Sequence, residues 1–161
     1  MSQTTASERA YPNVGAGTDP YRLTDAFDDA DRLVLLLQRD YYCQVCKRQT
    51  KRFAERYDEF AERNAEVVVV VPDPPDKVEG WARDIEPPFP LLADDDAALG
   101  DEYDQRVRFG VLGELHDAIG RMPEAVVLSH DGEMNVEHVH RGGSYFDRPS
   151  VDELLEKVDD A

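Results

Sequence analysis

The sequence predicts an α/β protein built on a central mixed β-sheet with helices on both faces. Two nearly unbroken apolar runs, LVLLL (33–37) and VVVVVP (67–72), are typical of inner strands that are covered on both sides. A helical segment lies between them, which favours a parallel crossover. Two later runs, AVVLS (125–129) and MNVEHVH (134–140), are joined by HDGE, and an Asp-Gly step between β-rich runs predicts an antiparallel hairpin.

Helices are expected to fill the remaining segments. We expect them over 44–63, 78–85, 93–105 and 151–161. In 44–63 the apolar residues recur at helical spacing, so that one stripe faces a core. The acidic start of 93–105 suits a helix N-terminus, and Ser150 suits the N-cap of the last helix. The expected order is β–α–β–α–α–β–β–α, with a loop near 106–122.

A length of 161 residues suits one domain, which we expect over 20–161. Residues 1–19 are mostly small and polar and include Gly and Pro, so the start of this segment is expected to be loosely ordered. No apolar run approaches the ~18 residues that span a bilayer, and the N-terminus lacks a basic stretch followed by an apolar core. The sequence therefore predicts a soluble, cytoplasmic protein with no membrane partner.

The chain is strongly acidic, with 35 Asp and Glu against 18 Lys and Arg and a net charge of −17. This charge argues against a nucleic acid partner, because phosphate binding depends on Lys and Arg. The acids are dispersed along the chain, and 14 of the 18 basic residues are arginine. Such a coat resembles that of proteins from halophilic archaea, the alternative being an ordinary acidic soluble protein. Either way, the charge concerns solubility and says little about the fold.

The only two cysteines, Cys43 and Cys46, lie where the first strong strand meets the first long helix. Sites in α/β proteins lie at this carboxyl edge of the sheet. The helix N-terminus stabilises a thiolate relative to a thiol. A three-residue separation also lets the two sulfurs meet, so a disulfide can open and close locally. In an intracellular chain this arrangement favours a redox pair.

Four basic residues, Lys47, Arg48, Lys51 and Arg52, follow the second cysteine closely. Together with the helix end they would favour deprotonation of the more exposed thiol. The alternative is that they form an ordinary solvated helix face.

Two other interpretations of the cysteines stay open, a buried structural pair and a zinc site. A zinc site needs two more ligands, and His138 and His140 lack the usual zinc-ligand spacing. These two histidines alternate on one face of a strand, which is typical of exposed strand positions. His116 and His130 fall in a loop and a turn, and nothing links them to the thiols.

Several motifs resemble those of known redox proteins. The stretch LVLLLQRDYYCQVCK is similar to the first central strand and active-site turn of the thioredoxin-like superfamily, with Tyr42 where thioredoxins carry tryptophan. The stretch GRMPEAVVLSHDGEM resembles the later Pro-strand-turn-strand segment. The resemblance implies that Pro123 is the cis-proline that packs beside the disulfide. The middle of the chain, from VVVVVP to GDEYD, resembles peroxiredoxins of the alkyl hydroperoxide reductase/thiol-specific antioxidant type.

Peroxiredoxins carry a P-x-x-x-T-x-x-C pattern, which assigns the peroxidatic cysteine to Cys46 of this chain. The threonine position then falls on Cys43 and the proline position on Arg39, so two of the three landmarks differ. The later family arginine that supports the thiolate would fall near Pro123, about two residues from Arg121.

From these features we predict a thiol-disulfide oxidoreductase of thioredoxin-like fold. Cys43 would attack a protein or small-molecule disulfide, and Cys46 would resolve the mixed disulfide, without a metal or organic cofactor. Tyr42 and Pro123 would shape the contact surface, and Arg121 would stabilise the anionic sulfur. The alternatives are a thiol peroxidase with Cys46 peroxidatic and Cys43 resolving, and a non-catalytic binding or zinc module. The partners would be a disulfide or peroxide substrate and a reductant protein or small thiol, in an assembly whose oligomeric state the sequence does not predict.

Overall fold

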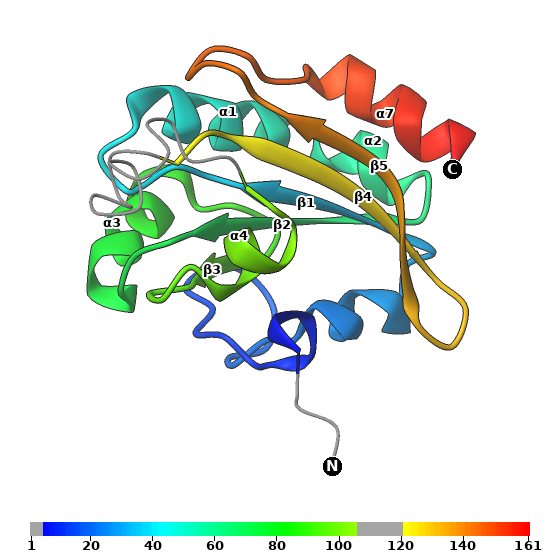
Figure 1. Ribbon diagram of the computed structural model, residues 1–161, viewed down its shortest axis with the longest axis horizontal. Helices are drawn as coiled ribbons and strands as arrows, with labels where there is room; N and C mark the ends of the chain where they lie inside the picture. Colours follow the sequence, from blue (N-terminus) through cyan, green and yellow to red (C-terminus); the bar gives the residue numbers. More distant parts are fainter. Residues whose placement is uncertain (1–4, 106–120) are drawn as a thin grey trace.

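A computed structural model describes residues 5–105 and 121–161 of the chain (Figure 1). Its described strands form one sheet in the order β3–β2–β1–β4–β5. These strands are β1 (Arg32–Leu37), β2 (Ala65–Val71), β3 (Leu91–Ala93), β4 (Glu124–His130) and β5 (Met134–Arg141). β1, β2 and β3 are parallel, whereas β4 pairs antiparallel with β1 and β5 antiparallel with β4. The predicted mixed sheet is confirmed, with β1 at its centre.

The apolar run of β1 is buried on both faces of the sheet. Val34 and Leu36 pack into the core on one face, and Leu33, Leu35 and Leu37 pack into the core on the other. Successive side chains of a strand point to opposite faces. An unbroken apolar run is therefore what a doubly covered strand requires.

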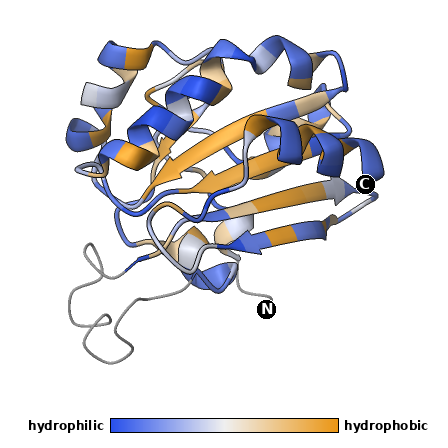
Figure 2. Ribbon diagram, turned by 90° about the horizontal axis from the view of Figure 1, so that it is seen from above, coloured by the Kyte–Doolittle hydropathy of each residue, from blue (hydrophilic) through white to orange (hydrophobic). Residues whose placement is uncertain are grey.

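Helices and the N-terminal segment cover the two faces (Figures 1 and 2). The helices are α1 (Gln44–Glu55), α2 (Tyr57–Ala61), α3 (Pro75–Ile85), α4 (Ala98–Glu102) and α7 (Val151–Asp160). α1, α2, α3 and α7 contribute to the core on one face, and α4 and the N-terminal segment to the core on the other. No helix among the described residues is both long and apolar enough to cross a membrane.

The hairpin and the last helix are close to those predicted. β4 and β5 pair around the turn that contains Gly132, whose φ of +95° lies in the region that favours glycine. α7 begins at Val151, and the hydroxyl of Ser150 accepts the N–H of Glu153 at 3.1 Å. This N-cap confirms the predicted start of the helix.

The first long helix is interrupted. The predicted helix over 44–63 divides into α1 and α2 at Arg56, whose φ of −114° and ψ of 19° depart from helical values. Phe53 and Phe60 are nevertheless buried on the same side, with ring centroids 5.5 Å apart. α3 begins at Pro75, three residues before the predicted start, because proline is well suited to the first helical position.

The helix predicted over 93–105 is present but much shorter than predicted. Its first residue ends the short strand β3, which the sequence did not predict, and only Ala98–Glu102 form α4. The carboxylate of Asp94 accepts the N–H groups of Ala98 at 3.2 Å and Leu99 at 2.9 Å. The first acid thus caps a helix that begins four residues later. Most of the loop predicted near 106–122, with His116, lies outside the described residues.

The N-terminal segment is bound to the sheet, although the sequence predicts loose order for 1–19. Tyr11 is buried and exchanges two backbone hydrogen bonds of 2.9 Å with Tyr21. The side-chain oxygen of Asn13 accepts the N–H of Leu91 in β3 at 3.0 Å. The described part of the segment thus makes specific contacts with the sheet, and the division of the chain at residue 20 stays a prediction. Two short 3₁₀ helices, η1 (Ala6–Glu8) and η2 (Leu23–Asp28), lie in this region.

Candidate active site

Cys43 and Cys46 form a disulfide at the start of α1, with Cα atoms 5.2 Å apart. Cys43 is the N-cap of the helix, and its sulfur accepts the N–H of Cys46 at 3.1 Å. β1 ends at Leu37, so the pair lies just beyond the carboxyl end of the central strand. The structure therefore brings the two sulfurs together where the sequence places them.

Both cysteines are buried, Cys46 completely and Cys43 with 6% of its surface exposed. Burial alone agrees with the interpretation of a structural disulfide. Of the two residues, Cys43 keeps the larger exposed fraction.

Arg148, which the sequence interpretation did not single out, contacts the sulfurs of both cysteines. It lies just before α7, and its Nη2 donates to the sulfur of Cys46 at 2.9 Å and to that of Cys43 at 3.6 Å. A neutral sulfur is a weak acceptor, whereas a thiolate accepts a charge-assisted bond from a guanidinium. The arrangement therefore suits a sulfur that carries negative charge during its chemistry.

Other contacts hold the guanidinium of Arg148 in place. Its Nη1 donates to the side-chain oxygens of Gln38 and Gln49 at 2.8 Å each, and its Nε donates to the carbonyl of Tyr145 at 2.7 Å. Burial lowers the pKa of Arg148 to about 10, and the charge of Arg39 adds to this effect. Arg148 is thus still cationic at neutral pH.

Two carboxylates support the turn that precedes Cys43. Asp73 accepts the N–H of Tyr41 at 2.8 Å, and burial raises its pKa to about 6. Burial also raises the pKa of Asp40, against the opposing effects of Arg39 and of the backbone N–H groups at 42 and 43. The path of the chain into α1 is therefore fixed by groups outside the helix.

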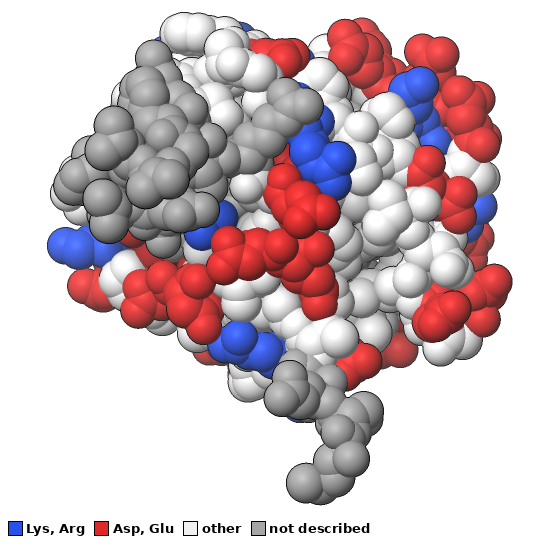
Figure 3. All heavy atoms as spheres, viewed as in Figure 1, with Lys and Arg blue, Asp and Glu red and all other residues white. Residues whose placement is uncertain are grey.

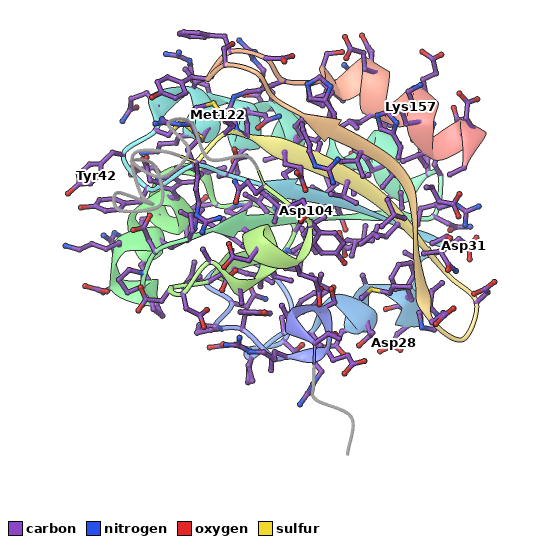
Figure 4. All side chains as sticks on the ribbon, in the orientation of Figure 1. Asp28, Asp31, Tyr42, Asp104, Met122 and Lys157 are labelled. Carbon is purple, nitrogen blue, oxygen red and sulfur yellow. A yellow bond between two sulfur atoms is a disulfide. The ribbon has the colours of Figure 1, made fainter. Side chains whose placement is uncertain are left out.

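Tyr42 directly precedes Cys43 in the chain, and its side chain points away from the fold at the left of Figure 4. Its side chain is 71% exposed, and its ring lies against that of Tyr41 with centroids 3.9 Å apart. An exposed aromatic residue adjacent to Cys43 is suited to contact a reactant, so this role stays a prediction.

The resemblance implies a cis peptide bond before Pro123, and this expectation is wrong. The bond before Pro123 is trans, and among the described residues the cis bond joins Asp19 and Pro20. Pro123 is buried, and its carbonyl accepts the N–H of Gly142 at 2.9 Å. The neighbouring Arg121 donates to Gln105 at 3.3 Å and to Asp101 at 3.1 Å. The contribution of Pro123 to the contact surface and that of Arg121 to the sulfur stay predictions.

Arg39, at the family's proline position, joins segments around the site. Its Nε donates to the carbonyl of Arg121 at 2.9 Å, and its guanidinium lies 3.5 Å from the ring centroid of Tyr145. Since Tyr145 also accepts from Arg148, Arg39 stabilises the segment that positions the sulfur-binding guanidinium.

The basic residues of α1 divide into two groups. Lys47 pairs with Asp84, whereas Arg48, Lys51 and Arg52 are exposed and form no ion pair with the described residues. The acidic side chains are spread over the surface, as Figure 3 shows for one face.

The histidines that the structure describes give no support to a zinc site. Within 5–105 and 121–161, no group of three or more His, Cys, Asp or Glu is placed to hold a metal ion. His140 lies 3.1 Å from a carboxylate oxygen of Asp147, and the ring of His130 stacks on Phe27.

Comparison with known proteins gives one family match. Residues 6–136 match the profile described as the AhpC/TSA family. No curated protein sequence matches the chain significantly.

Several solved structures share the fold. The peroxidoxin BcpB of Mycobacterium tuberculosis is 24% identical with a TM-score of 0.76, over 98% of this chain and 95% of that chain. The bacterioferritin comigratory protein of Xanthomonas campestris is 16% identical with a TM-score of 0.73, over 96% and 92%. AhpC of Enterococcus faecalis is 19% identical with a TM-score of 0.65, over 83% and 77%. These similarities confirm the predicted thioredoxin-like fold of peroxiredoxin type.

Proposed function

The chain belongs to the AhpC/TSA family, and from this premise we propose that it is a thiol peroxidase in which Cys46 attacks the peroxide and Cys43 resolves the product. Family and cysteine pair together make it a thiol-based oxidoreductase. The sequence analysis predicts disulfide exchange as the main activity and peroxide reduction as an alternative. The family match favours the alternative, peroxide reduction. The similar Xanthomonas protein has alkyl peroxide reduction activity, which supports peroxide reduction as the main activity of this chain.

The observation that carries the proposal is the contact between Arg148 and the sulfur of Cys46 at 2.9 Å. Cys46 occupies the peroxidatic position of the family pattern, and it lies in the first turn of α1. A guanidinium and a helix N-terminus both stabilise a thiolate. We therefore assign to Arg148 the stabilising role that the sequence interpretation gives to Arg121.

The reaction needs only the two cysteines and an external thiol. The Cys46 thiolate attacks one peroxide oxygen, the O–O bond breaks, and the other oxygen leaves as an alcohol or water after taking up a proton. The resulting sulfenic acid is attacked by the thiol of Cys43, which forms the disulfide and releases water. A thiol reductant then supplies two electrons and two protons to regenerate both thiols.

Disulfide exchange remains the second candidate, because the family's threonine position holds Cys43. This cysteine is the more exposed of the pair, and Tyr42 beside it offers an apolar contact surface. An incoming thiolate that attacks the sulfur of Cys43 would release Cys46 as a thiolate beside Arg148.

Stopped-flow oxidation of the reduced protein by hydrogen peroxide tests the proposal and separates the two candidates. We expect Cys43→Ser to react with peroxide far faster than a free thiol, and Cys46→Ser to react no faster than one. If both variants react only at the rate of a free thiol while the wild type still reduces disulfides, exchange is the main activity.

A further inference from the structure

The protein groups that hold the guanidinium of Arg148 are all neutral. Its Nη1 donates to the side-chain oxygens of Gln38 and Gln49 at 2.8 Å each, and its Nε donates to the carbonyl of Tyr145 at 2.7 Å. Its Nη2 contacts the two sulfurs of the disulfide. Within the described ranges Arg148 forms no ion pair, and the nearby charge of Arg39 is also positive. The charge of this arginine is therefore uncompensated.

The two glutamines form a buried pair that fixes the direction of the guanidinium. The Nε2 of Gln38 donates to the side-chain oxygen of Gln49 at 3.0 Å, so this oxygen accepts from Gln38 and from Arg148. Gln38 is 1% exposed and directly follows β1, and Gln49 is 8% exposed and lies in α1. Because one glutamine belongs to the end of the central strand and the other to the helix, the guanidinium is oriented from two sides.

Amide acceptors at this place have an electrostatic consequence. The chain has 35 Asp and Glu against 18 Lys and Arg, yet two amides rather than a carboxylate hold this arginine. A carboxylate would bind a guanidinium more strongly and would also neutralise it. An amide oxygen orients the guanidinium and leaves its charge available to a sulfur that becomes negative.

We propose that Gln38 and Gln49 are positioning residues that orient Arg148 without neutralising it, so that the Cys46 thiolate becomes its counter-ion and the disulfide is easy to reduce. In the disulfide both sulfurs are neutral, and a buried charge without a partner is unfavourable. Reduction of the disulfide creates the missing negative charge next to the guanidinium. A disulfide whose reduced form is stabilised in this way has a higher reduction potential.

This inference deepens the proposed function at the step that regenerates the thiols, and it rests on that function for its place in the cycle. A reductant thiolate attacks the sulfur of Cys43 and forms a mixed disulfide, and the electron pair of the broken S–S bond stays on Cys46 as a thiolate. A second reductant thiolate attacks the reductant sulfur of the mixed disulfide, and Cys43 leaves and takes up a proton. The thiolate that Arg148 stabilises is thus the product of reduction and the group that attacks the next peroxide.

Redox equilibration of the full-length protein with dithiothreitol buffers, as a function of pH, tests the proposal without any peroxide. Gln49→Glu keeps the oxygen that accepts from Gln38 and Arg148 but neutralises the guanidinium. We expect it to lower the equilibrium constant for reduction by about tenfold, which is a potential about 30 mV more negative. The full difference applies above the pKa of the Cys46 thiol in both proteins and disappears below both values, because only the thiolate interacts with the charge.

Two control variants separate charge from packing. Gln49→Met removes the acceptor without adding charge and should stay within about threefold of the wild type, because Gln38 still holds Nη1. Lys51→Gln changes the net charge by the same amount at an exposed position of α1 and should leave the equilibrium constant unchanged. If the glutamines act only through packing and hydrogen bonds, Gln49→Met has the larger effect and Gln49→Glu behaves like the wild type.

Equal constants for Gln49→Glu and the wild type, or an equal loss in Gln49→Met or Lys51→Gln, would overturn the proposal. Should circular dichroism show that Gln49→Glu does not fold, Gln38→Glu places a carboxylate at the other acceptor of Nη1 and should cause the same pH-dependent loss. An unchanged constant in that variant would overturn the proposal as well. If the wild type does not reduce hydrogen peroxide, the proposed function fails, whereas the dithiothreitol equilibrium still decides the role of the two glutamines.

Discussion

Arg148→Gln is the substitution that most directly separates an electrostatic role of this arginine from a structural one. The guanidinium lies 2.9 Å from the sulfur of Cys46 and keeps its charge at neutral pH although it is buried. Glutamine retains a hydrogen-bonding side chain but removes the charge. We expect the thiolate of Cys46 in the reduced protein to become less stable and its reaction with peroxide to slow down.

The size of the effect follows from the distance. Two unit charges 2.9 Å apart interact by about 6 kcal/mol at an effective dielectric constant of 20, which is an upper bound. Gln38, Gln49 and the carbonyl of Tyr145 compete for the same guanidinium, so the net value is nearer the ~1.5–3 kcal/mol of a hydrogen bond to a charged group. This corresponds to an increase of about one to two in the thiol pKa, which slows the reaction by at most roughly 10- to 100-fold, the full factor applying only where the pH lies below the thiol pKa of both proteins.

The assay is the pH dependence of iodoacetamide alkylation, measured on Cys43→Ser protein with and without Arg148→Gln. Arg148→Lys should restore part of the rate, because it returns the charge without the planar fork. Arg121→Gln tests the arginine that the sequence interpretation favours. If Arg148→Gln leaves the alkylation profile unchanged while circular dichroism shows an intact fold, or if Arg121→Gln produces the larger shift, the assignment of Arg148 is wrong.

Three further predictions concern stability. Burial raises the pKa of Asp73 from 3.8 to about 6, so its protonation stabilises the fold fully below about pH 4 and this contribution is lost as the pH rises through 6. Asp73→Asn should therefore remove about 1–2 kcal/mol of the pH dependence of the unfolding free energy between pH 4 and 7, after a discount for partial exposure. An unchanged pH profile would exclude this contribution. Phe60→Ala removes a fully buried ring that stacks on Phe53 and should lower the unfolding free energy by about 3–5 kcal/mol in denaturant titrations, and a loss under about 1 kcal/mol would contradict the packing. Ser150→Ala removes the hydroxyl that accepts the N–H at the start of α7 and should cost about 1 kcal/mol in the same titration, whereas equal stability would show that the cap is dispensable.

The sequence predicts those parts of the fold whose signals are local. β1 and β2 are recognisable because both faces are covered and their apolar runs are therefore unbroken. β3 is only three residues long and is followed at once by three acids, which resemble the first turn of a helix. The strand is specified by its pairing with β2, a long-range contact that no local pattern carries.

The candidate site also has a part that local sequence predicts and a part that it does not. The cysteines and the helix that they begin follow from adjacent residues, whereas Arg148 lies 102 residues from Cys46 in the sequence and reaches it only through the fold. One signal was present, because Arg148 lies two residues before Ser150, the N-cap of α7. The helix dipole disfavours a cation at that place unless a negative group lies nearby. The halophilic origin and the cytoplasmic location stay predictions.

Mass-spectrometric trapping of the sulfenic acid tests the central claim most directly. Reduced Cys43→Ser protein is treated with one equivalent of hydrogen peroxide in the presence of dimedone, with Cys46→Ser as the matched control. A dimedone adduct on Cys46 in the first variant, with no adduct on Cys43 in the second, is the predicted result. An adduct on Cys43 alone, or none on either cysteine, would contradict the assignment of Cys46 as the residue that attacks the peroxide.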